Sequence, residues 1–291
     1  MTELRKPYWL QSSKLGSRKT GEITRKLRSY NLHTVCESAR CPNRGECFER
    51  GTATFMILGD QCTRNCSFCA IEKKRENLAA PSPEEPVMIA RLSRELDLKH
   101  IVITTVTRDD LEDGGAGQFV RVIEEIRNHC EPDVTIEVLI SDLQGRWNDL
   151  KKILKAGPDI LNHNLETVRR LYPEVRPLAD YDRSLHLLGE ARKFNPSLLT
   201  KSGFMVGLGE TCAEINDLLT DLRSQDVDIL TIGQYLAPSK KHYPVAEYIR
   251  PDVFAEYRQA ALRIGFKIVE SGPLVRSSYH AERARKILKR R

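Results

Sequence analysis

The sequence lacks long apolar runs. No stretch of its 291 residues approaches the ~20 consecutive apolar residues that a membrane-spanning helix needs. The N-terminus, Met-Thr-Glu-Leu-Arg-Lys-Pro, contains no apolar signal core. We therefore expect a cytoplasmic protein with no membrane partner. Hydrophobic residues make up 40% and charged residues 30%, which is typical of a globular chain long enough for one large domain.

The cysteines lack the arrangements that usually indicate disulfides or structural zinc. A disulfide framework is not expected in a chain of this length without a secretion signal. Zinc knuckles are usually built from two CxxC pairs or from Cys/His pairs, and here only Cys66 and Cys69 form a CxxC. His33 completes no such pair. A zinc-binding interaction module without enzymatic activity stays open as an alternative.

Six of the eight cysteines lie within 34 residues, in two triplets of different spacing. The first triplet, CxxxxCxxxxxC, is Cys36, Cys41 and Cys47, and the second triplet, CxxxCxxC, is Cys62, Cys66 and Cys69. Two triplets suggest two metal centres. A CxxxCxxC loop lets three thiolates converge on one object, which is one ligand short of the four that usually close an iron–sulfur cube. The open iron would bind a small molecule and pass it an electron.

Charge is distributed unevenly along the chain. Residues 1–33 carry eight Lys and Arg against two Glu, and residues 276–291 carry seven against one. Because the net charge of the whole chain is only +6, the body between these ends is acidic. Basic ends favour an acidic macromolecular partner, with solvated tails as the simpler alternative.

Apolar runs alternate with helical patterns at intervals of roughly 30–40 residues. Strands are predicted at 54–58, 100–106, 134–140, 159–165, 198–206 and 228–232, with a last short run at 267–270. Helices are predicted at 23–32, 87–96, 119–127, 147–154, 181–194, 212–223 and 254–263. Repeated βα units indicate a parallel sheet. Six units fit an α/β fold with a partial (βα)6 TIM-like barrel better than a complete eight-unit barrel.

Polar side chains follow several predicted strands. In barrels of this kind the chemistry lies at the carboxyl ends of the strands. The second triplet directly follows the first barrel strand, Asn164 and Glu166 follow the fourth, and Lys201 lies in the fifth. Further candidates at strand ends are Thr104, Thr105, Thr107, Asn162, His163, Gly207, Gly209, Glu210, Gln234 and Tyr235. We expect these groups to gather around the cysteine loop.

The second triplet resembles the signature of the radical S-adenosylmethionine enzymes, CxxxCxxC with an aromatic residue, here Phe68, before the last cysteine. The first triplet and the motif Arg276-Ser-Ser-Tyr279 narrow the resemblance to the lipoyl synthase family. Residues 54–60, 107–116 and 205–210 are also similar to that family, and the resemblance spans residues 30–285.

The resemblance implies two 4Fe–4S clusters. The second triplet would hold the cluster whose open iron chelates S-adenosylmethionine, within a radical S-adenosylmethionine barrel at residues 52–266. The first triplet, in an N-terminal extension at 1–51, would hold an auxiliary cluster whose fourth ligand is the oxygen of Ser278, in a C-terminal extension at 267–291. Clusters are normally held by thiolates, so an oxygen ligand should be displaceable.

The S-adenosylmethionine pocket is expected to include Phe68 and polar groups at strand ends. Asn164 and Glu166 would bind ribose hydroxyls, and Lys201 or Arg176 would meet the carboxylate or the substrate. For each polar group, the alternative is a structural role, in which neighbouring protein groups at the strand end satisfy its hydrogen bonds.

The resemblance also implies a sulfurtransferase reaction. One electron cleaves S-adenosylmethionine to methionine and a 5′-deoxyadenosyl radical, which removes hydrogen from an octanoyl chain. The carbon radical bonds to a sulfide of the auxiliary cluster, and a second S-adenosylmethionine repeats this step, so that sulfur enters at C6 and C8. The octanoyl chain is an amide on a lysine of a lipoyl domain, in E2 subunits of 2-oxoacid dehydrogenases or in the glycine cleavage H protein. Other expected partners are an electron donor such as ferredoxin or flavodoxin and an iron–sulfur carrier protein, but no nucleic acid.

A two-cluster methylthiotransferase acting on transfer RNA is the nearest alternative, and it would account for the basic ends. It predicts an RNA-binding β-domain at the C-terminus, for which no room remains after Tyr279. The zinc module instead predicts a colourless protein without inorganic sulfide.

Overall fold

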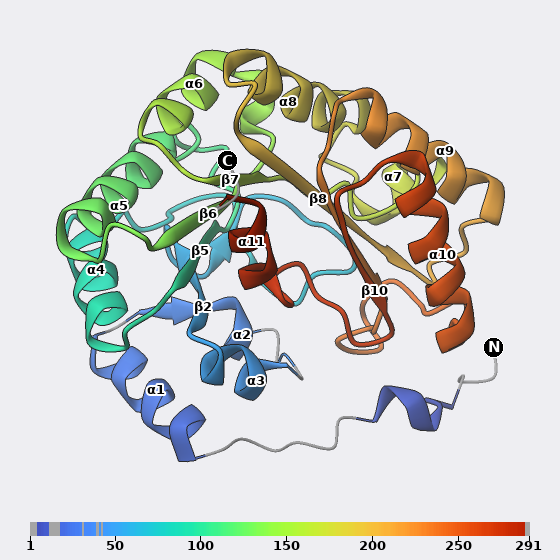
Figure 1. The fold of residues 1–291 in the computed structure, drawn as a ribbon, viewed down its shortest axis with the longest axis horizontal. Helices are drawn as coiled ribbons and strands as arrows, with labels where there is room; N and C mark the ends of the chain where they lie inside the picture. The colour runs from blue at the N-terminus through green and yellow to red at the C-terminus, as the bar shows by residue number, and fades with distance from the viewer. Residues whose placement is uncertain (1–4, 12–17, 31, 39–40, 42, 289–291) are drawn as a thin grey trace.

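The chain folds around an open, curved sheet with helices on its outer side (Figure 1). The structure is a computed structural model and describes residues 5–11, 18–30, 32–38, 41 and 43–288. The order of the large sheet is β1 (His33–Thr34), β2 (Thr52–Ile57), β5 (His100–Thr105), β6 (Thr135–Leu139), β7 (Ile160–Asn162), β8 (Leu199–Val206), β9 (Ile229–Gln234) and β10 (Ile268–Gly272). Two short strands, β3 (Gln61–Cys62) and β4 (Glu72–Lys73), pair beside the second triplet.

Neighbouring strands of the large sheet are parallel, except that β1 pairs with β2 antiparallel. All residues of β2 and β9 are buried, as expected where a parallel sheet is covered on both faces. The predicted partial barrel of βα units is therefore confirmed. β10 pairs in parallel with β9, so the sheet continues one strand beyond the six that the apolar runs predict.

The larger helices connect the parallel strands and form an arc around the sheet (Figure 1). The helices of the described chain are η1 (Tyr8–Leu10), α1 (Arg18–Ser29), α2 (Val35–Ser38), α3 (Arg44–Glu49), α4 (Glu85–Glu95), α5 (Ala116–His129), η2 (Leu143–Gly145), α6 (Trp147–Lys155), η3 (Arg169–Leu171), α7 (Tyr172–Val175), α8 (Tyr181–Phe194), α9 (Cys212–Ser224), α10 (Pro251–Ile264), η4 (Ala281–Ala284) and α11 (Arg285–Leu288). α8 spans its predicted range because Asp180 accepts a hydrogen bond from the backbone N–H of Arg183 and so caps its first turn.

The open side of the sheet, between its edge strands β1 and β10, is covered by two distant parts of the chain. They are α2 with α3, and a C-terminal segment that we define as residues 273–288 (Figure 1). Asn43 Nδ2 donates to the carbonyl oxygen of Leu274 at 2.7 Å, and Arg50 pairs with Glu282 at 3.1 Å. The two parts therefore hold each other in place across the gap.

The C-terminal segment runs through the barrel from its carboxyl edge to its amino edge. At the carboxyl edge, Ser277 accepts a hydrogen bond from Asn162 at the end of β7. At the amino edge, Arg285 pairs at 2.8 Å with Asp133, which precedes β6. Between them, Ala284 packs against the apolar residues Ile160, Leu199 and Ile229, which face the barrel interior. This segment therefore forms part of the core.

The N-terminal part packs into another cluster of the core, which includes Phe55 and Ile57 of β2. Ile23 and Leu27 of α1 are buried with Phe48 of α3.

Lys14 and the basic residues 289–291, which contribute to the predicted basic ends, lie outside the described residues. Among the helices that the structure describes, none combines the length and apolar character needed to cross a bilayer.

Replacing Gly233 by alanine should displace the C-terminal segment. A Cβ at Gly233 of β9 would lie 2.3 Å from the carbonyl oxygen of Val275, so backbone must move. We expect Gly233→Ala to lower the free energy of unfolding by about 1–3 kcal/mol, as overpacking does. Urea unfolding of the cluster-free protein measures this change. Gly21→Ala is the matched control, because nothing lies within 4 Å of its added Cβ; equal losses in both variants would contradict the prediction.

Candidate active site

The loop of the second triplet is fixed to the carboxyl edge of the sheet. It follows β2, and the backbone N–H of Thr63 donates to the carbonyl oxygen of Thr107, just beyond β5, at 3.0 Å. The backbone N–H of Ser67 donates to Val175 of α7 at 2.9 Å, and its carbonyl oxygen accepts from Tyr243, beyond β9, also at 2.9 Å. Hydrogen bonds to two other loops and to α7 thus hold the cysteines where the sequence predicts the chemistry.

Arg64, inside this loop, is the centre of a buried ion network that the sequence did not reveal. Its guanidinium is only 3% exposed and binds Asp109 through two hydrogen bonds, at 2.8 and 3.0 Å. It also pairs with Asp142 at 2.5 Å, and the other oxygen of Asp142 pairs with Arg183 at 2.8 Å. Burial alone would raise the pKa of Asp142, but Arg64 holds that pKa well below its ordinary value.

Loss of the Arg64 charge should destabilise the protein. Arg64→Gln leaves Asp142 fully buried with only Arg183 as a charged partner, and removing one member of a buried pair typically costs about 3–5 kcal/mol. We expect the free energy of unfolding of the cluster-free protein, measured with urea, to fall by an amount near the lower end of this range. The control is Arg170→Gln, since Arg170 makes a similar two-bond pair with Glu214 on the surface. A control variant as unstable as Arg64→Gln would refute the importance of burial.

The three thiols of the second triplet lie close enough to affect one another. Burial raises the pKa of Cys66 and of Cys69, and the neighbouring Cys62 raises both further. Arg176 and Lys73 act in the opposite direction on Cys66 and Cys69 respectively, but they do not offset burial. These thiols are reduced and half-buried.

The first triplet shows the same pattern. Burial, with Cys41 as the next cause, raises the pKa of Cys36 to about 12. Burial and the neighbouring Cys36 and Cys41 also raise the pKa of Cys47 on α3. Arg276, from the C-terminal motif, is near enough to Cys41 for each to affect the pKa of the other. The structure thus brings the first triplet and the motif to one place.

The donor chemistry of both triplets fits iron–sulfur clusters. All eight cysteines are free, so no disulfide competes for the thiols. Each triplet crowds half-buried thiols together with little compensating positive charge, which a cluster of iron ions would supply. Within the described ranges, no three Cys, His, Asp or Glu side chains are arranged to hold a single metal ion.

Three of the predicted S-adenosylmethionine contacts lie together beside Cys66. Asn164 Nδ2 donates to Glu166 Oε1 at 3.0 Å, and Arg176 Nη1 donates to the carbonyl oxygen of Asn164 at 3.1 Å. The guanidinium of Arg176 also lies near enough to Cys66 to lower the pKa of its thiol. Burial raises the pKa of Glu166, although Arg176 acts against this. The cysteine loop and the end of β7 therefore form one polar site.

Glu166 has an unusual backbone conformation. Its φ is +68°. This value lies in the left-handed region, where the backbone of a residue with a Cβ is strained. Two hydrogen bonds hold it there: its N–H donates to the carbonyl oxygen of Gly203 at 3.0 Å, and its own carbonyl oxygen accepts from Met205 at 2.9 Å. The fold therefore over-determines the position of this carboxylate, as is common at ligand sites.

The remaining predicted contacts, Phe68 and Lys201, occupy different places. Phe68 is half-buried and packs with Met205 and Tyr243 against the core beside β8 and β9. Lys201 is 2% exposed inside the barrel, where its ammonium pairs with both oxygens of Glu137 at 2.8 and 3.1 Å. His100 also contacts Glu137, at 3.3 Å. A role for Lys201 in binding S-adenosylmethionine stays a prediction.

Ser278 and the motif around it lie between the first triplet and the barrel. Ser278 is half-buried, and its neighbour Tyr279 donates from its hydroxyl to Glu46 on α3 at 3.3 Å. His280 contacts Glu46 and Glu270, both at 3.3 Å. The predicted oxygen ligand is therefore carried on a segment that is fastened to the helix of Cys47.

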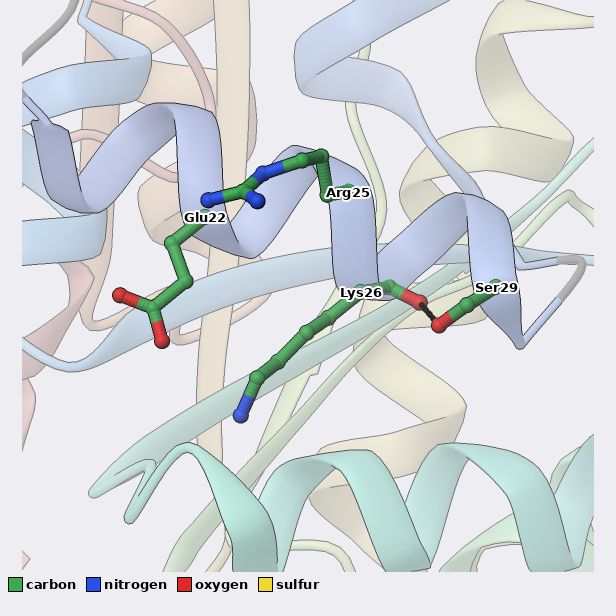
Figure 2. A pocket seen from close by; sticks show the side chains of 4 residues that line it. All are labelled: Glu22, Arg25, Lys26 and Ser29. Carbon is green, nitrogen blue, oxygen red and sulfur yellow. Dashed lines mark hydrogen bonds between the residues drawn. The ribbon is translucent and has the colours of Figure 1, made fainter.

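Two cavities among the described residues are lined by no cysteine of either triplet. A surface hollow of about 510 Å³ lies on α1 and is lined by Glu22, Arg25, Lys26 and Ser29 (Figure 2). Lys26 extends from it toward α4, where it pairs with Glu95 at 2.6 Å. No predicted site residue lines this hollow. A second cavity, of about 10 Å³ between Lys201 and the C-terminal segment, has room for one water molecule at most.

His163, just beyond β7, makes the stability of this region depend on pH. It is 2% exposed, its Nδ1 donates to the carbonyl oxygen of Ile140 at 2.9 Å, and its Nε2 has no hydrogen-bond partner among the described residues. Burial lowers its pKa from 6.5 to about 4. The unfolded chain therefore takes up a proton at higher pH than the native protein does, so the free energy of unfolding falls as the pH drops from 6.5 to about 4.

His163→Asn should remove this dependence. Asparagine keeps a donor for Ile140 but does not titrate, so the loss of stability between pH 7 and 4.5 should shrink by about 2–3 kcal/mol relative to the wild type. Urea unfolding at both pH values measures it. His186→Asn on the exposed face of α8 is the control and should keep the wild-type dependence. An unchanged slope in His163→Asn would contradict the assignment.

Comparison with known proteins identifies the family. The Radical SAM superfamily model matches residues 56–222. The chain is 50% identical over 288 residues to the lipoyl synthase of Caldicellulosiruptor bescii, covering 99% of this chain and 98% of the relative. It is 52% identical over 282 residues to that of Caldanaerobacter subterraneus, covering 96% of each. The chain belongs to the lipoyl synthase family.

Membership of the lipoyl synthase family makes this chain a sulfur-inserting enzyme of the radical S-adenosylmethionine superfamily. This match covers nearly the whole chain, well beyond the residues that the superfamily model matches. Among solved structures, methylornithine synthase has a TM-score of 0.57 at 13% identity, covering 86% of this chain and 81% of that one. A maturase of the FeFe-hydrogenase has a TM-score of 0.55 at 15% identity, covering 94% and 75%. These two likenesses concern the fold alone.

Proposed function

We propose that this enzyme inserts two sulfur atoms, at C6 and C8, into an octanoyl chain held as an amide on a lysine of a lipoyl domain. One observation carries the proposal. The first triplet and the C-terminal motif lie more than 200 residues apart in sequence, yet hydrogen bonds join them across the open side of the barrel. A barrel that only generated a radical would have no need for this second cysteine site.

The second triplet, Cys62, Cys66 and Cys69, would hold the 4Fe–4S cluster that binds S-adenosylmethionine. When bound, the cluster and S-adenosylmethionine would together supply a hydrogen-abstracting radical. The chain's own contribution is to position the pair: Arg64 fixes the cysteine loop, and Arg176 places a positive charge beside Cys66. Other residues proposed to touch S-adenosylmethionine are Phe68, Asn164, Glu166 and, less directly placed, Lys201.

The first triplet, Cys36, Cys41 and Cys47, with the oxygen of Ser278, would hold an auxiliary 4Fe–4S cluster, the source of sulfur. The proposal is supported by Arg276 beside Cys41 and by the hydrogen bond of Tyr279 to Glu46. Iron–sulfur clusters are normally held by thiolates, so Ser278 would provide the cluster with an exchangeable oxygen ligand. In this scheme, the C-terminal segment excludes water from the barrel interior while Ser278 stays exchangeable.

The proposed partners follow from the same reaction. The octanoylated carriers are lipoyl domains of 2-oxoacid dehydrogenase E2 subunits and the glycine cleavage H protein. A ferredoxin or flavodoxin would supply electrons, and an iron–sulfur carrier protein would rebuild the auxiliary cluster. The basic ends of the chain suit acidic protein surfaces. The free thiols suit a reducing compartment, so we place the enzyme in the cytoplasm.

A single-turnover assay tests the function. Anaerobically reconstituted protein should contain about eight iron and eight sulfide per chain. With an octanoyl-lysyl peptide, dithionite and S-adenosylmethionine, it should convert the peptide to a dithiolated product, as measured by mass spectrometry. Cys41→Ala should lose about four iron and all product while still cleaving S-adenosylmethionine, because the second triplet is intact.

Cys130→Ala is the matched control, because Cys130 lies at the end of α5, outside both triplets, and should keep the full iron content and product. Thiolated product from Cys41→Ala would rule out the auxiliary cluster as the sulfur source. Absence of any thiolated product from the wild type would end the proposal.

A further inference from the structure

The hydroxyl of Ser277 connects the C-terminal motif to β7. It accepts a hydrogen bond from Asn162 Nδ2 at 3.0 Å and lies 3.4 Å from Asn164 Oδ1, to which it donates. Asn162 is the last residue of β7 and is fully buried, and Asn164 follows two residues later. One small side chain is therefore held between two amides of the same strand end.

Both asparagines are themselves fixed from the other side. Asn162 Nδ2 also donates to Glu137 at 2.8 Å, and Glu137 is held by the buried Lys201. Asn164 Nδ2 donates to Glu166, and its backbone oxygen accepts from Arg176. A continuous chain of polar contacts thus runs from the barrel interior, through Ser277, to the proposed S-adenosylmethionine site.

Two glycines allow this close approach. A Cβ at Gly233 of β9 would lie 2.3 Å from the carbonyl oxygen of Val275. One at Gly203 of β8 would lie 2.2 Å from Thr231 Oγ1 and 3.2 Å from Asn164 Oδ1. Neither glycine has a positive φ, so their backbone conformations do not require glycine. The C-terminal segment leaves no room for a Cβ at Gly233, whereas at Gly203 the Thr231 hydroxyl is the nearest obstacle and Asn164 the next.

We propose that Ser277 is a positioning residue: its hydroxyl locks the C-terminal motif to β7 and so fixes where the neighbouring Ser278 oxygen lies. The inference rests on the proposed function, and it concerns a residue that is not itself a cluster ligand. Consecutive Cα atoms are 3.8 Å apart, so a hydroxyl held at one residue restricts the backbone of the next. Asn164 extends the lock to the site of Glu166 and Arg176.

Ser277→Ala tests the proposal by removing the hydroxyl alone. Loss of one such hydrogen bond corresponds to a change on the order of fivefold. We expect the amount of 5′-deoxyadenosine released per thiolated product to rise by that factor, while the iron content stays normal. Amide hydrogen exchange of residues 273–280 in the cluster-free protein should accelerate by a similar factor, which is a readout independent of catalysis.

Two further variants make the test specific. Ser277→Thr keeps the hydroxyl and should retain the wild-type product ratio and exchange rates. Ser271→Ala is the matched control, because Ser271 of β10 is also half-buried and donates one 2.8 Å hydrogen bond, to Phe254, away from the motif. It should raise neither the product ratio nor the exchange of residues 273–280.

The outcomes separate this inference from the proposed function. Wild-type exchange and product ratio in Ser277→Ala would overturn the inference and leave the function standing. If Ser277→Ala fails to load its clusters, Ser277→Thr decides: a threonine variant as defective as the alanine one would show that the hydroxyl is not what matters. A wild type that makes no thiolated product would overturn the function, while accelerated exchange in Ser277→Ala would still establish the lock.

Discussion

A parallel sheet that does not close leaves two edges and an interior to be covered, and this requirement shapes the whole molecule. The gap between the edge strands β1 and β10 is filled by α3, which carries Cys47, and by the C-terminal segment, which carries Ser278. Asn43, Glu46 and Arg50 of the first part contact Leu274, Tyr279 and Glu282 of the second. The cover of the barrel is thus also the place of the first triplet.

Buried ion pairs fix the cysteine loop and the barrel strands relative to one another. Arg64 joins the cysteine loop to Asp109 and Asp142, and Lys201 joins β8 to Glu137 on β6. Such pairs add little net stability, because desolvation costs about as much as the attraction gains, but breaking one is costly. Their effect is therefore to select one arrangement of loop and strands, as a site with two proposed clusters requires.

Much of the fold follows from the sequence because the buried strands are continuous apolar runs and the helices repeat every 3.6 residues. α8 spans its predicted range, since Asp180 and the Asn195-Pro196 pair mark its ends. β10, Ile-Val-Glu-Ser-Gly, overlaps the last short run predicted at 267–270, which is too short and polar to count as a further strand of the barrel. Its membership depends on pairing with β9, which is a tertiary fact.

The candidate site, like the fold, could be predicted from the sequence only in part. The grouping of Asn164 and Glu166 near Cys66 could be predicted, because the ends of parallel strands meet at one edge. The partners of Arg64 could not, since a charge in a loop does not specify which carboxylate it will meet. Lys201 lies near the start of β8, and its place in the strand directs it into the barrel toward Glu137.

The path of the C-terminal segment has a consequence for biogenesis. Ile160, Leu199 and Ile229 are synthesised long before Ala284, against which they pack. During translation the apolar residues of the barrel interior consequently stay uncovered until residues 281–288 emerge from the ribosome. Contacts between residues so far apart in sequence also form slowly. The segment that carries the first triplet therefore lacks its hydrogen-bond partners Leu274 and Tyr279 until most of the described chain has been synthesised.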